Sequence, residues 1–189
     1  MEPVSLTTAR LLLRPLGPDD AAAVHAICQD PGIQRWVALP TPYEPEHAER
    51  FVEQSVPDGW RSGTICTFGM LPADGGPLLG AVNAHRQTGT WEIGYWTARE
   101  HRGRGYTTEA VRAVAHWSFT ALGAGRLEWR AEVGNTGSRA VAERAGFTVE
   151  GVLRAAVFQQ GTLRDAWVGS LLPSDLGLAG PYAYLPHPG

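Results

Sequence analysis

The sequence contains no lysine, because all 16 of its Lys+Arg residues are arginines. A P-loop holds phosphate with a lysine and a Schiff-base enzyme needs a side-chain amine, so ordinary forms of both are excluded. The two cysteines, Cys28 and Cys66, form no CxxC pair, and the six histidines lack the HExxH spacing of a zinc enzyme. We therefore expect no metal site and no disulfide framework, and reduced thiols fit a cytoplasmic protein.

Long apolar runs are also missing from the 189 residues. The first segment, 1–16, includes Glu2, Arg10 and Arg14 and does not show the pattern of a signal peptide. A membrane helix needs about 18 consecutive apolar residues, and no such stretch occurs. These two absences predict a soluble, intracellular protein.

Charge is unevenly distributed along the chain, whose net charge is −3. Residues 86–164 carry a net charge of +4, whereas residues 1–85 carry −5. A basic middle in an acidic protein indicates a bound anionic ligand, although an ordinary solvated arginine face gives the same pattern. The negative overall charge argues against a nucleic-acid partner.

Apolar periodicity predicts one mixed α/β domain over residues 1–172, followed by a Pro/Gly-rich tail over 173–189. In the tail, Tyr182, Tyr184 and Leu185 are candidates for docking on the body or on a second subunit. The predicted strands are 8–16, 65–71, 78–84, 91–97, 126–133, 149–158 and 163–172. The predicted helices are 20–28, 45–55, 107–122 and 138–145, and Pro31-Gly32 is expected to end the first of them.

The strongest local signal is the run Arg102-Gly-Arg-Gly-Tyr-Thr107, between a predicted strand and a predicted helix. Its glycines allow a tight turn, and the following helix offers free N–H groups and the positive end of its dipole. The run therefore indicates a phosphate or diphosphate site; the alternative is a plain turn with two solvated arginines. A dinucleotide-binding Rossmann turn does not fit, because Thr108 stands where GxGxxG needs its third glycine.

Further motifs accompany this run in a fixed order: Glu92-Ile-Gly-Tyr-Trp96, Asn135-x-x-Ser138, Ala145-Gly-Phe147, Glu150-Gly-Val-Leu-Arg154 and Arg164-Asp165. Together with Arg102-x-x-Gly105-x-Thr107 they resemble the GNAT superfamily of acyl-CoA-dependent N-acyltransferases, and within it the RimJ/RimL branch of ribosomal-protein N-terminal acetyltransferases. The resemblance implies the GNAT fold, a mixed central sheet of about seven strands splayed between strands four and five and flanked by about four helices. Thr107 departs from the Gly or Ala that is usual in the signature.

The resemblance also implies where acetyl-CoA, the expected co-substrate, binds. Its pantetheine arm would pair with the end of the fourth strand, and its diphosphate would lie on the amides of the next turn. In this sequence the expected CoA-binding residues are Trp96, Thr97, Arg102, Gly103, Arg104, Gly105, Tyr106, Thr107 and Asn135.

The resemblance assigns Ser138 as the donor to the leaving thiolate, and Glu92 is our candidate general base, since a carboxylate on an apolar strand is costly without a role. Each also has a structural alternative: Ser138 as a residue near a helix start, and Glu92 as the partner of an arginine. Glu150 and Asp165 are reserve candidates for the base, and Asn135 is equally a helix cap.

The acceptor is expected to be a primary amine, either a protein N-terminus or a small molecule. Trp36 and Tyr43, in the segment after the first helix, are candidate substrate contacts, with core packing as the alternative. A longer acyl donor such as succinyl-CoA, a homodimer, and a non-catalytic CoA-binding sensor are the other hypotheses that the sequence leaves open.

Overall fold

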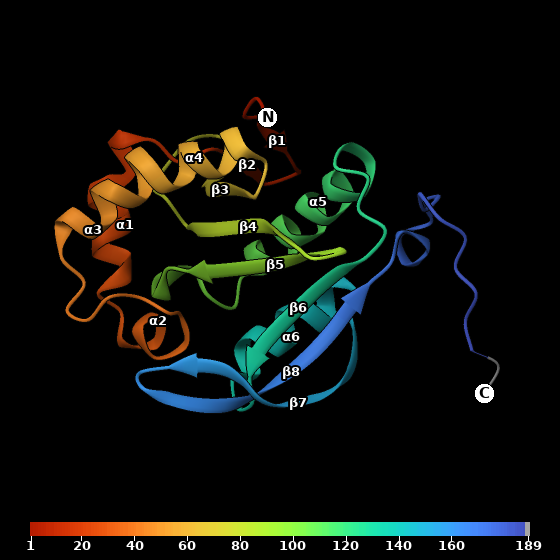
Figure 1. The fold of residues 1–189 in the computed structure, drawn as a ribbon. Coiled ribbons are helices and arrows are strands. Elements are labelled where there is room, and N and C mark those ends of the chain that lie inside the picture. The colour runs from red at the N-terminus through yellow and green to blue at the C-terminus, as the bar shows by residue number, and fades with distance from the viewer. Residues whose placement is uncertain (188–189) are drawn as a thin grey trace.

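The computed structural model describes residues 1–187 and contains one eight-stranded sheet with helices on both faces (Figure 1). Neighbouring strands follow the order β1-β2-β3-β4-β5-β6-β8-β7, and all pairs are antiparallel except β5 with β6. The strands are β1 (Leu6–Thr7), β2 (Leu11–Arg14), β3 (Ile65–Pro72), β4 (Gly80–Gln87), β5 (Thr90–Thr97), β6 (Leu127–Glu132), β7 (Thr148–Gln159) and β8 (Thr162–Leu171). The predicted mixed α/β class is confirmed.

Helices α1, α3 and α4 lie in front of the sheet in Figure 1, and α5 and α6 lie behind it. The helices are α1 (Ala21–Cys28), α2 (Pro31–Trp36), α3 (Pro45–Arg50), α4 (Val56–Ser62), α5 (Tyr106–Ala121) and α6 (Thr136–Ala145). A π turn spans Phe51–Ser55, and 3₁₀ turns span Pro18–Asp20, Arg99–His101 and Pro173–Leu176.

The sheet has eight strands where the sequence predicts about seven, because the N-terminal segment forms two parts: the short strand β1, which precedes the predicted strand 8–16, and β2, which lies within it. A tight turn joins the two parts: the Thr8 backbone N–H donates to the Leu11 carbonyl, and the Leu11 N–H donates to the Thr8 hydroxyl. The second part keeps the expected alternation, since Leu11 and Leu13 are fully buried.

The dipeptide Pro31-Gly32 does more than end the first helix, because Pro31 also begins α2, a helix that the sequence does not predict. Proline suits the first helical position, where no intrahelical N–H bond is lost. The Asp30 side chain caps this helix by accepting a hydrogen bond from the Gly32 N–H at 3.2 Å.

The helix predicted over 45–55 also continues further, through the π turn into α4 and on to Ser62. Pro57 has no N–H to offer the carbonyl four residues earlier, which accounts for the widened turn before it. Trp60 therefore lies in a helix, where it is buried against Phe68 and Trp117.

The C-terminal tail runs away from the sheet in Figure 1 after the last 3₁₀ turn. Pro181 and Tyr182 pass beside Gly125, but Tyr182 is 84% exposed, and Tyr184 and Leu185 are also exposed. The docking expected of these three side chains is therefore not seen in the isolated chain.

Candidate functional site

A cavity opens where β5 and β6 separate. These two strands pair only at Trp91 with Leu127 and at Glu92 with Glu128, after which β5 stays with β4 and β6 stays with β8. The cavity between them has a volume of about 670 Å³, within the range of small-molecule sites. Its lining includes Trp36, Gly94, Tyr95, Trp96, Thr97, Arg102, Gly103, Thr107, Trp129, Glu132, Asn135, Ser138 and Arg144.

The glycine run after β5 forms one end of this cavity. Gly103 and Gly105 have φ of 75° and 79°, a left-handed conformation that favours glycine, and Gly105 is the N-cap of α5. A Cβ added at Gly103 would meet no atom within 4 Å, so space adjoins the backbone there. Arg10 fastens the turn by donating from Nη1 to the Arg104 carbonyl at 3.1 Å. The first-turn N–H groups of α5 complete a seat for an anion.

Two residues expected to serve the phosphates directly are engaged within the protein. The Arg102 guanidinium forms an ion pair with Asp30, and its Nε donates to the Thr97 carbonyl at 3.0 Å. The Thr107 hydroxyl lies 2.6 Å from the Thr97 hydroxyl and is buried. Thr107 thus joins the end of β5 to the start of α5, a role that the sequence does not reveal.

Near the glycine run, Arg104, Arg112 and Arg144 form no ion pair within residues 1–187. Of these, Arg112 donates a hydrogen bond to the Arg144 carbonyl. Arg144, near the end of α6, also borders a second cavity of about 300 Å³. That cavity is lined by Arg10, Gly105, Thr108, Glu109, Arg112 and Arg144. Arg144 is not among the residues predicted from the sequence, and no pattern near it in the chain points to the glycine run.

At the middle of the split, Ser138 and Asn135 lie at the start of α6. Asn135 is the N-cap of this helix, because its Oδ1 accepts from the Ser138 N–H at 3.1 Å. The Ser138 hydroxyl accepts from the Trp129 indole N–H at 3.0 Å and donates to the Tyr95 hydroxyl at 3.2 Å. Both residues line the cavity, so the capping role of Asn135 is compatible with ligand contact.

Glu92 is half-buried on β5, beside the cavity rather than among the described residues that line it. Burial raises the pKa of this carboxyl, while Arg130, whose Nε lies 3.9 Å from Glu92 Oε2, opposes the shift. The next residue, Ile93, does line the cavity. A water between Glu92 and a bound amine would be needed for proton transfer.

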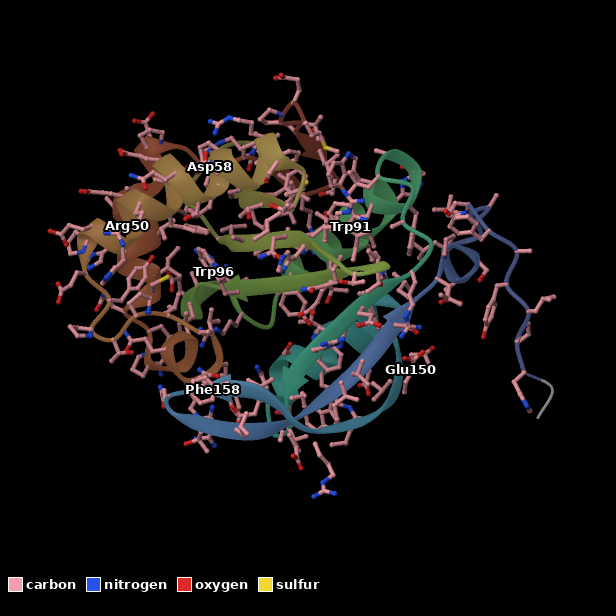
Figure 2. The ribbon with its side chains drawn as sticks, in the orientation of Figure 1. Arg50, Asp58, Trp91, Trp96, Glu150 and Phe158 are labelled. Carbon is pink, nitrogen blue, oxygen red and sulfur yellow. The ribbon has the colours of Figure 1, made fainter. Side chains whose placement is uncertain are left out.

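The two reserve carboxylates lie elsewhere. Glu150 pairs with Arg126 at 2.7 Å and accepts from the Ser170 hydroxyl, and its hydrogen bonds to Arg126 hold its pKa below the usual range. In Figure 2 it lies on β7 at the opposite end of the strand from Phe158. Asp165 accepts from the Ala155 N–H within the β7–β8 hairpin. Like Glu92, neither is among the described residues that line the cavity.

The far end of the cavity is closed by α2. Trp36 lines it, and the Arg35 guanidinium lies 4.0 Å above the centre of the Trp36 ring. Arg35 also holds the buried Glu132 of β6 through two hydrogen bonds of 2.8 and 2.6 Å, which lower the pKa of that carboxyl. Gln159, at the tip of the β7–β8 hairpin, donates to the Arg35 carbonyl at 3.0 Å.

The structure does not place Tyr43 where it could contact the acceptor substrate, contrary to the expectation from the sequence. It is 6% exposed and packs between His25 and His47, so it presents no ring to the cavity. Its burial follows from the continuous helical segment after it, which folds the Tyr43 ring against α1 and α3.

Neither a metal site nor a membrane span emerges from the described chain. No group of three or more His, Cys, Asp or Glu side chains within residues 1–187 is placed to hold a metal ion. None of the helices over the same residues is long and apolar enough to cross a membrane.

Comparison with known proteins agrees with this geometry. The family model described as an acetyltransferase (GNAT) domain matches residues 10–148. The candidate ribosomal N-acetyltransferase YdaF of Bacillus subtilis strain 168 is 34% identical over 170 residues, which cover 86% of this chain and 91% of YdaF. The uncharacterized N-acetyltransferase p20 of Bacillus licheniformis is 29% identical over 171 residues, covering 89% of this chain and 96% of p20.

A solved structure gives the same result in three dimensions. A candidate ribosomal-protein-serine acetyltransferase from Vibrio cholerae superposes with a TM-score of 0.79 at 27% identity, covering 90% of this chain and 98% of that one. The split sheet, the glycine turn before α5 and the matched domain therefore agree, and the chain belongs to the GNAT acetyltransferase family as an acyl-CoA-dependent N-acyltransferase.

Proposed function

We propose that the protein transfers an acetyl group from acetyl-CoA to the N-terminal α-amine of another protein, by direct attack in a ternary complex. The observation that carries the proposal is the single cavity that joins the glycine turn, Ser138 and the wall formed by Trp36 and Glu132. In this proposal the end at the glycine turn receives the diphosphate and the end at Trp36 receives the amine. The protein acceptor is supported by similarity to YdaF, whose name describes a candidate ribosomal N-acetyltransferase.

The roles proposed for the CoA-binding residues follow from their places in the cavity. The free edge of β5 at Trp96 and Thr97 offers backbone groups to the pantetheine arm, since β5 has no partner on that side beyond Glu92. The amides from Gly103 to Thr107 receive the diphosphate, and Arg104 and Arg144 add positive charge. Asn135 meets the pantetheine amides next to Ser138.

The proposed chemistry needs no covalent enzyme intermediate. The neutral amine attacks the thioester carbon, a C–N bond forms, and the amine proton passes through water to Glu92. When the C–S bond breaks, the electron pair goes to sulfur, and the Ser138 hydroxyl donates a hydrogen bond to the thiolate. The N-terminal end of α6 favours the same negative charge.

In the proposed organisation, residues 1–172 form the catalytic domain and 173–189 a Pro/Gly-rich tail. The sheet and the cavity lie entirely within the first segment. Because Pro173 is buried and Leu176 and Leu178 pack against the core, a version ending at Leu178 is expected to keep its activity.

Following thiol release with Ellman's reagent tests the transfer. Background from the enzyme should be small, because burial raises the pKa of both Cys28 and Cys66 to about 11. Peptides with a free N-terminus should release thiol, and the same peptides with a blocked N-terminus and an internal lysine should not. The experiment also includes a panel of small acceptors, namely amino acids, polyamines and aminoglycosides. Succinyl-CoA is tested as an alternative acyl donor.

Each outcome is decisive for the acceptor. Turnover with small amines alone would replace the protein acceptor by a small molecule. Tight CoA binding without turnover on any amine would leave a CoA-binding sensor and overturn the transferase mechanism.

A further inference from the structure

Three side chains from three different elements meet at the Ser138 hydroxyl. Tyr95 comes from β5 and Trp129 from β6, the two strands that separate around the cavity, and Ser138 comes from α6. The Trp129 indole nitrogen is 3.0 Å from Ser138 Oγ, and the Tyr95 hydroxyl is 3.2 Å from the same oxygen. The Tyr95 hydroxyl also donates to the Ser138 carbonyl at 2.8 Å.

The chemistry of these groups sets the direction of each hydrogen bond. An indole N–H only donates, so Ser138 Oγ is the acceptor in its contact with Trp129. The Tyr95 proton is used in the shorter bond to the Ser138 carbonyl. The remaining proton is that of Ser138 itself, which points to the Tyr95 oxygen over 3.2 Å, longer than the usual O–H···O distance of about 2.7–2.8 Å. This weak bond is easily exchanged for a better acceptor in the cavity.

Trp129 is held firmly in its place. The residue is 1% exposed, and its ring packs beside Gly169 on the neighbouring strand β8, where a Cβ would lie 3.4 Å from Trp129 Cε3. A hydroxyl that accepts a hydrogen bond becomes a stronger donor, because linked hydrogen bonds polarise one another, and the effect is larger away from water.

We infer that Trp129 is a positioning residue for acyl transfer: its indole N–H orients the Ser138 hydroxyl toward the cavity and strengthens it as the donor to the leaving thiolate. The inference rests on the proposed role of Ser138 and adds a group that does not touch the reacting atoms. The sequence around Trp129 does not indicate this positioning role. The segment contains no proline or glycine, and its apolar alternation identifies Trp129 only as a core residue.

The test is Trp129→Phe, which keeps most of the ring and removes the N–H. We expect kcat to fall about 3- to 10-fold, with KM for acetyl-CoA and Kd for CoA unchanged within about twofold. The matched control is Trp117→Phe, because Trp117 packs against Trp60 and Phe68 and does not line the cavity. Equal losses of kcat in both variants would assign the effect to packing and overturn the inference.

A double-mutant cycle separates action through Ser138 from any other effect. In a Ser138→Ala background, Trp129→Phe should change kcat less than about 1.5-fold, because the hydroxyl it serves is gone. An undiminished loss in that background would contradict the inference while leaving acetyl transfer itself demonstrated. Absence of transfer by the unmodified enzyme would instead contradict the proposed function.

A spectroscopic measurement keeps the inference testable if Trp129→Phe fails to fold. The chain has seven tryptophans, so a ¹⁵N-labelled sample shows seven indole N–H resonances. Ser138→Ala should shift one of them strongly upfield, as expected for loss of a hydrogen-bond acceptor. If none moves beyond the small shifts of the others, the Trp129–Ser138 bond is absent in solution and the inference fails.

Discussion

Replacing Gly103 by alanine separates ligand binding from backbone strain. Gly103 has φ of 75° and open space where a Cβ would stand, and Gly63, at the end of α4, has φ of 68° and equally open space. The two substitutions therefore impose nearly the same local strain without a clash inside the protein. Of the two glycines, only Gly103 borders the cavity.

The expected magnitudes follow from these two facts. A left-handed alanine costs about 1–2 kcal/mol, so both variants should lose a few degrees in Tm, at roughly 2–4 °C per kcal/mol for a chain of this size. At Gly103 the new methyl group also occupies the space in which a diphosphate must lie. Loss of one charge-assisted hydrogen bond is worth about 1.5–3 kcal/mol, which weakens CoA binding about 10- to 150-fold.

Thermal unfolding and isothermal titration with CoA measure the two effects on the same samples. Gly103→Ala should match Gly63→Ala in Tm and bind CoA far more weakly. If both variants bind CoA as tightly as the unmodified protein, the glycine turn does not hold the diphosphate, and the CoA-binding roles given to its neighbours fail with it.

Two further predictions concern titrating carboxylates. A general base must be ionised, so kcat should fall as the pH drops through the raised pKa of Glu92. Glu92→Gln should remove this acidic limb of the kcat–pH profile and lower kcat about 10²- to 10⁴-fold. The control Glu128→Gln, which removes the other carboxylate paired with Arg130, should keep the acidic limb. Glu132 has a lowered pKa in the folded state, so its stabilising effect is present above its unfolded pKa of about 4.3 and is lost as pH falls through the folded value. Arg35→Gln should therefore move the acid-unfolding midpoint, followed by circular dichroism, to higher pH. Arg154→Gln on the exposed hairpin removes the same charge as a control, and coincident curves would show that the Arg35 pair does not contribute.

Much of the fold is predictable because its elements have strong periodic patterns. The buried pair Leu11 and Leu13, and the apolar face of α5, follow directly from spacing. The missed helix α2 shows the limit of local patterns. Pro31 both ends one helix and suits the first position of the next, so the dipeptide alone does not decide between a stop and a new start.

The candidate site is only partly predictable for a different reason. The glycine turn, Asn135 and Ser138 belong to short motifs, and the structure brings them to one cavity. By contrast, Arg35 and Glu132, which pair with each other, are 97 positions apart in the sequence, and Arg102 and Asp30 are 72 positions apart. Contacts of this range depend on how the sheet divides, which no local pattern contains. The prediction for Tyr43 is wrong for the same reason, since its neighbours come from two helices.

Helix α2 connects the β5 side and the β6 side of the cavity, which the sheet itself leaves separated. One end is fastened to the β5 side through Asp30 and Arg102, and the other to the β6 side through Arg35 and Glu132. The six residues of α2, with their N-cap Asp30, thus bridge the two sides of the cavity through one ion pair near each end, so removing either pair would free one end of the helix while the other stays attached to the opposite wall.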